Sequence, residues 1–139
     1  MSDVFSDKNI ENVIDLNRQI VANRDEPFGL DDSQVFYDIF RRVNGFGGES
    51  DPKLRIIKKS ATLLSGIVWK RPFKNGNKAT ATAITKYFLQ KNGYFFPLST
   101  DDDEREYFKL LERTVEKVEG DKTIYSEIEE YLFGKVIRI

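Results

Sequence analysis

One polar turn carries the side chains of this chain that could do chemistry. It reads Trp69-Lys70-Arg71-Pro72-Phe73-Lys74-Asn75-Gly76-Asn77-Lys78-Ala79-Thr80-Ala81. A proline lacks an amide donor and its ring clashes with the preceding helical turn, so a helix upstream must end near Lys70. Gly76 can adopt a left-handed backbone and the flanking asparagines can bond nearby backbone groups, which lets several amides point into one hollow.

The chemistry that this turn favours is the binding of an anion. The first amides of a helix have no partner within the helix and carry a partial positive charge. Four cationic side chains crowd the same stretch, namely Lys70, Arg71, Lys74 and Lys78. An ordinary connection with solvated lysines would show similar residues, because Asn-Gly turns are common. The residues that we expect to bind phosphate are Arg71, Lys74, Gly76, Asn77 and Lys78.

The composition limits the classes of protein to which the chain can belong. The 139 residues are 40% hydrophobic, enough for one core, so we expect a single domain over residues 1–139. The net charge of -1 predicts no nucleic-acid binding. The absence of cysteine, of an apolar leader and of a membrane-spanning run predicts a cytoplasmic protein. The absence of histidine removes the commonest general base and metal ligand, so no metal ligand is assigned.

The elements that must position the turn are helices. Apolar spacing and caps indicate helices at about 9–22, 33–43, 52–70, 79–92, 100–120 and 123–134, with Asn9 as the first cap and Asp51-Pro52 opening the central core helix. The expected buried faces include Tyr87 in the fourth segment, and Phe108, Leu111, Val115 and Val118 in the fifth. Asn17 lies on an apolar face, as hydrogen-bonded core amides do.

Strands contribute little to the expected fold. The run Tyr94–Leu98 has the composition of a short strand, although Pro97 favours an extended connector. The sequence contains no repeat and no ladder of strands. We therefore predict an all-α fold of about six helices.

The turn resembles the His-Pro-Phe-x-Asp-Gly-Asn-Lys-Arg-Thr-Ala motif of the Fic/Doc family, in its death-on-curing (Doc) branch. Residues 13–17, 28–31 and 87–94 are also similar to that branch. The resemblance implies a helical domain that binds ATP with Mg²⁺ at the turn and transfers a phosphoryl or nucleotidyl group to a protein hydroxyl. In the Doc branch this is a kinase-like phosphorylation of a translation elongation factor, held in check by a partner antitoxin in a toxin-antitoxin pair.

Three positions depart from the family motif, and they are the ones that carry its chemistry. Arg71 stands at the position of the histidine base, Asn75 at that of the magnesium carboxylate and Ala79 at that of a phosphate-binding arginine. An arginine stays protonated, so Arg71 cannot accept a proton. An amide is a weaker magnesium ligand than a carboxylate, and the side chain of an alanine cannot donate to phosphate. We therefore assign no catalytic residue.

Three functions are compatible with these residues. The first, which we favour, is a catalytically impaired Fic/Doc-like protein that keeps a nucleotide-binding or phosphate-binding turn. The second is an active transferase whose unusual base comes from a distant carboxylate such as Asp31, Asp32 or Glu49. The third is a non-catalytic helical interaction module, which predicts no affinity for anions.

Overall fold

The structure is a computed structural model that describes residues 3–46 and 48–139. Within these residues the chain forms six helices and two short strands: α1 (Asp7–Asn23), α2 (Ser33–Asn44), α3 (Pro52–Lys70), α4 (Asn77–Lys91), β1 (Tyr94–Phe95), α5 (Asp101–Glu116), α6 (Thr123–Lys135) and β2 (Ile137–Arg138). The predicted all-α fold is confirmed. None of the described helices combines the length and the apolar character needed to cross a bilayer.

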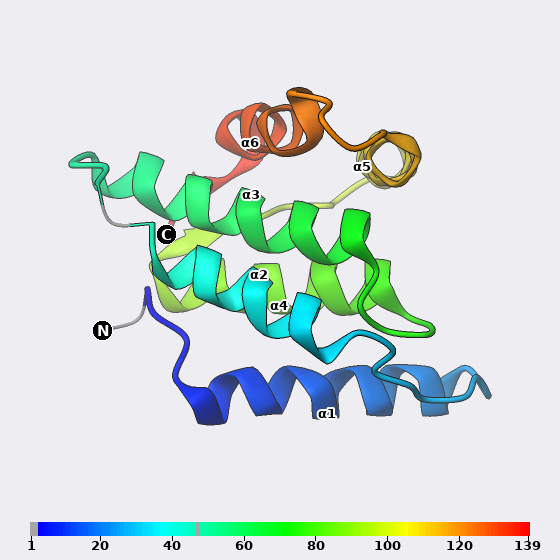
Figure 1. Cartoon of the computed structure of the whole chain (residues 1–139). Helices are drawn as coiled ribbons and strands as arrows, with labels where there is room; N and C mark the ends of the chain where they lie inside the picture. The colour runs from blue at the N-terminus through cyan, green and yellow to red at the C-terminus, as the bar shows by residue number, and fades with distance from the viewer. Residues whose placement is uncertain (1–2, 47) are drawn as a thin grey trace.

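Helices α2, α4, α5 and α6 pack around α3, and α1 packs against α4. Asp51 caps α3 by accepting a hydrogen bond from the Leu54 amide at 3.0 Å, and Pro52 occupies its first turn. Every residue of α3 from 60 to 68 is buried, and the helix contacts α2, α4, α5 and α6. In Figure 1, α1 lies on one side of α2, α3 and α4, while α5 and α6 lie on the other. The predicted central core helix is therefore confirmed.

Two helices differ from the sequence-based prediction at their N-terminal ends. The hydroxyl of Ser6 accepts a hydrogen bond from the Asn9 amide at 3.1 Å, so α1 begins at Asp7 and Asn9 is not its cap. α4 begins at Asn77, two residues before the predicted start, because Gly76 takes the left-handed conformation that directs the chain into the helix.

The buried face of α5 also differs from the prediction. Phe108 was expected in the core but is 50% exposed. Val118 was also expected there but is 72% exposed, because α5 ends at Glu116 and not near residue 120 as predicted. Tyr107 is buried instead, because its ring packs on Phe96 at 5.3 Å while its hydroxyl reaches Thr82 Oγ1 at 2.6 Å. An aromatic residue whose polar tip finds a partner can occupy a core position. Leu111 is buried as predicted, together with Tyr107, Leu110 and Thr114, so the expected and observed faces overlap.

The strands form a single short pair. β1 and β2 are antiparallel, with Tyr94 opposite Arg138 and Phe95 opposite Ile137. The run from Tyr94 thus includes a strand of two residues, and Pro97 follows it. Two residues are too few to show strand alternation, so the sequence did not reveal β2.

Candidate functional site

The turn predicted as the site joins the end of α3 to the start of α4. Arg71 ends α3 with a φ of 51°, and its amide still donates to Ile67 O at 3.0 Å. This left-handed conformation is uncommon for a residue with a long side chain. Pro72 and Phe73 are buried directly after it, whereas Arg71 is exposed. The chain therefore reverses at a fixed corner that leaves a cationic side chain at the surface.

A segment of the α1–α2 connection lies along this turn. Leu30 and Phe73 form an isolated antiparallel bridge, and the Asp31 amide donates to Pro72 O at 2.9 Å. The bridge joins residues 43 positions apart in the sequence, and no pattern within either segment predicts the pairing. It places Asp31 directly beside the turn.

The missing side chain of Gly29 leaves space that Asp31 and Lys74 border from two sides. The Lys74 amide donates to Gly29 O at 2.8 Å. A Cβ on Gly29 would lie 3.1 Å from both Asp31 Oδ1 and Lys74 Cβ, closer than most real contacts of that kind. Asp31 and Lys74, the latter an expected phosphate ligand, therefore flank the same glycine at the edge of the turn.

The other two carboxylates considered as replacement bases have different positions. Asp32 caps α2, because its Oδ1 accepts a hydrogen bond from the Val35 amide at 3.0 Å. Glu49 precedes the start of α3, whereas the turn follows its end. The 19 residues of α3 separate these points by about 28 Å. Only Asp31 among the three is both beside the turn and free of a capping role.

Asn77 stabilises the turn with its own side chain. Its Oδ1 accepts a hydrogen bond from the Phe73 amide at 3.0 Å, and its Nδ2 donates to Phe73 O at 2.8 Å. Asn77 is 4% exposed, so both bonds are shielded from water. The first bond of the helix itself runs from the Thr80 amide to Gly76 O at 2.9 Å. The amides of residues 77–79 precede it and have no partner within the helix.

α1 contacts the turn through the side chain of Asn17, which is fully buried. Its Nδ2 donates to Asn75 O at 2.9 Å and to Thr80 Oγ1 at 3.0 Å, so the predicted core amide is confirmed. Gly76 has a φ of 76°, and a Cβ there would lie 3.0 Å from Val21 Cγ1 and 3.1 Å from Asn17 Nδ2. Both the backbone and the space therefore require glycine at this position.

Asn75 uses its side chain as a structural contact. Its Nδ2 donates to Pro27 O at 3.0 Å, which attaches the turn to the α1–α2 connection. A carboxylate could not make this donation. Among the described residues, no group of three or more His, Cys, Asp or Glu side chains is placed to hold a metal ion. The amide oxygen of Asn75 is a weaker ligand for a magnesium ion than a carboxylate at this position would be.

α5 contacts the first two turns of α4. The Lys78 ammonium donates to the Glu112 carboxylate, and the hydroxyls of Thr82 and Tyr107 share the hydrogen bond already described. Burial raises the pKa of the Tyr107 hydroxyl, which therefore stays protonated. In the described part of the chain, Arg71 and Lys74 form no ion pair. Glu112 is thus a contact of the site that sequence reasoning missed, since it lies on a separate helix with no motif around it.

These features define a class of protein: an all-helical domain in which a turn between two central helices, held by side-chain hydrogen bonds, places the first amides of a helix next to cationic side chains. The model of the Fic/DOC family matches residues 8–89, which is more than half of the chain and includes nearly all of α1, the turn and most of α4. The protein belongs to the Fic/DOC family. Searches of curated proteins and of solved structures gave no match.

Proposed function

We propose that the protein binds the phosphate groups of a nucleotide at the turn between α3 and α4 and is impaired as a transferase. The observation that carries this proposal is the start of α4, where three amides precede the first intrahelical bond. Such amides favour phosphate, and the buried contacts of Asn17 and Asn77 fix their direction. The exposed Arg71 and Lys74 add positive potential at the same corner.

The impairment follows from the side chains at the reacting positions. A phosphoryl or nucleotidyl transfer to a hydroxyl needs a group that accepts the hydroxyl proton, and Arg71 cannot accept one. Asn75 already donates to the α1–α2 connection, and Ala79 has no charge to set against developing negative charge on phosphate. The backbone amides that would bind phosphate are therefore retained, whereas the side chains that would catalyse the transfer are missing.

Asp31 supports a second candidate function, an active transferase with an unusual base. Its amide donates to Pro72 O, and its carboxylate lies beside Gly29 and Lys74 at the edge of the turn. A carboxylate in this place could take the proton that Arg71 cannot. Transfer of label from ATP by the unmodified chain, lost in Asp31→Asn, would establish this function in place of the first.

ATP is expected to raise the melting temperature. At a hundred times its Kd it should stabilise the native state by about 2.7 kcal/mol, or about 10 °C for a chain of this size. Lys78→Ala should reduce the shift by removing a cation next to the open amides. Glu112→Gln should increase it, because the carboxylate that now holds Lys78 is removed. Scanning fluorimetry with and without Mg²⁺ measures these shifts.

The matched control is Lys86→Ala, which removes a lysine from the same helix outside the turn. It should leave the ATP shift unchanged. A melting curve that ATP does not move in any of these proteins would favour the interaction-module function.

A further inference from the structure

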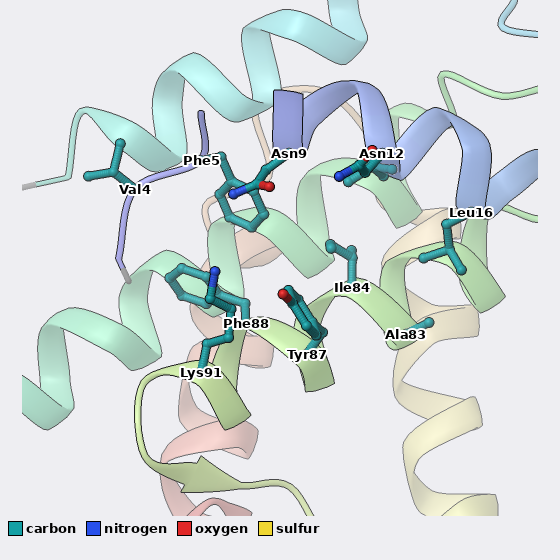
Figure 2. Close-up of a pocket in the computed structure, with 11 residues that line it drawn as sticks. Val4, Phe5, Asn9, Asn12, Leu16, Ala83, Ile84, Tyr87, Phe88 and Lys91 are labelled. Atoms are coloured by element: carbon teal, nitrogen blue, oxygen red, sulfur yellow. The ribbon is translucent and has the colours of Figure 1, made fainter. Parts of the chain in front are cut away.

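A groove between α1 and α4 lies outside the turn and uses the opposite end of the same two helices. Its volume is about 310 Å³, and it extends from Asn9 to Leu16 on α1 and from Ala83 to Lys91 on α4 (Figure 2). Val4 and Phe5 close one end. The turn instead contacts Asn17 and later residues of α1, so the groove is a separate site.

The wall of the groove is fixed by contacts of Phe5. The Phe5 amide donates to Asn44 Oδ1 at 2.8 Å, and Asn44 Nδ2 donates to Phe5 O at 2.9 Å. The Phe5 ring stacks on Phe88 at 5.2 Å and meets the edge of Phe40 at 5.0 Å. A ligand would thus enter a formed groove without first ordering the segment that closes it, which lowers the entropic cost of binding.

The lining is mostly apolar, with the side-chain amides of Asn9 and Asn12 and one positive charge. Of the described residues that line the groove, Lys91 carries the only charge, and none is a carboxylate. The Lys91 Nζ lies 5.4 Å from the centroid of the Tyr87 ring, and in Figure 2 both side chains rise from α4 on the side that faces Asn9. Tyr87 was expected in the core but is 54% exposed, and Val4 is 47% exposed. Large apolar surface around a single cation fits a ligand with an apolar body and one anionic group.

The length of the groove limits the size of that ligand. The eight residues from Asn9 to Leu16 are seven helical steps apart end to end, a rise of about 10 Å along α1. The volume is at the lower end of the range for ligand pockets. We propose that this groove binds a medium-chain aliphatic carboxylate, with its chain between α1 and α4 and its carboxylate at Lys91.

Octanoate is the probe for this proposal, with octanol as its uncharged counterpart. Titration of the full-length, ¹⁵N-labelled chain should shift amides of residues 9–16 and 83–91, and octanoate should bind about fivefold more tightly than octanol, as expected for an exposed charge pair. Lys91→Met removes the charge but keeps an apolar side chain, so this variant should bind octanoate no more tightly than octanol. Lys86→Met, on the same helix outside the groove, should bind octanoate as the unmodified chain does.

Ala83→Trp should block both compounds by filling the groove, and Leu16→Trp serves the same purpose if the first variant does not fold. Equal affinities for octanoate and octanol, an unchanged affinity in Lys91→Met, or shifts confined to residues outside the groove would overturn the proposal, as would no binding at millimolar concentration. The ATP titration is a separate measurement that reports on other residues. A failure of the octanoate proposal can therefore be told apart from a failure of the ATP proposal.

Discussion

The variant Arg71→His/Asn75→Asp/Ala79→Arg is expected to transfer label from ATP to protein, whereas the unmodified chain transfers none. The three changes supply a proton acceptor, a carboxylate for the magnesium ion that accompanies ATP, and a donor for charge on the phosphates. A general base alone typically contributes about 10²–10⁴-fold, so restored activity should stand well above a silent background. Autoradiography after incubation with α- or γ-labelled ATP and a cell lysate measures it.

The structure accommodates these three changes to different degrees. Histidine is among the residues that tolerate a positive φ, so it suits the 51° backbone at Arg71 better than arginine does. Ala79 is only partly buried on the first turn of α4, which leaves room for an arginine. Asn75→Asp removes the donation to Pro27 O and brings a carboxylate against that carbonyl, so the new side chain should rotate away and loosen the α1–α2 connection.

Arg71→His by itself is the control and should stay silent, because the other two contributions are still missing. The account attributes the loss of transferase activity to these three positions. It would be contradicted if the unmodified chain transferred as much label as the triple variant. In that case the Asp31→Asn variant would identify the base.

Gly76→Ala is expected to destabilise the fold and to weaken the binding of ATP at the turn. A residue with a Cβ is strained at a φ of 76°, and the added carbon would contact Val21 and Asn17 at 3.0 and 3.1 Å. We expect a loss of about 2 kcal/mol in the free energy of unfolding. The displaced Asn17 would also release the turn, so the affinity for ATP should fall by at least about tenfold, equivalent to about 1.4 kcal/mol. Urea unfolding and ATP titration measure the two effects.

Gly93→Ala is a matched control for this variant. Gly93 also has a positive φ, 87°, but a Cβ there would meet nothing within 4 Å, and it follows the far end of α4. Its replacement should cost stability through backbone strain and leave ATP affinity intact. If both variants lost ATP affinity equally, local support of the turn by Gly76 would not explain the loss.

The sequence identified the turn because its signals are local. Pro72 and Gly76 restrict the backbone by their own chemistry, and Asp51-Pro52 marks the start of α3 in the same way. These features needed no knowledge of distant residues. The family match over residues 8–89 agrees with the resemblance that those residues suggested.

The contacts that complete the site could not be predicted because they join residues far apart in the sequence. The bond from Asn17 to Asn75, the bridge from Leu30 and the ion pair of Glu112 each depend on how the helices pack. A hydrophobic pattern shows that a helix has a buried face, but it does not specify which partner meets each polar side chain. Tyr87 is a further example. Its position in the apolar pattern of α4 predicts burial, but α1 leaves this part of the face partly uncovered.

The most direct test of phosphate binding at the α3–α4 turn is an amide NMR titration of the ¹⁵N-labelled chain with ATP. The account predicts that the largest shifts fall on the amides of Asn77, Lys78 and Ala79, which precede the first intrahelical bond of α4. Shifts at these amides should persist without Mg²⁺, because the amides would bind phosphate directly and Asn75 offers the ion an amide in place of a carboxylate. Saturating ATP that leaves these three amides unmoved would contradict the account.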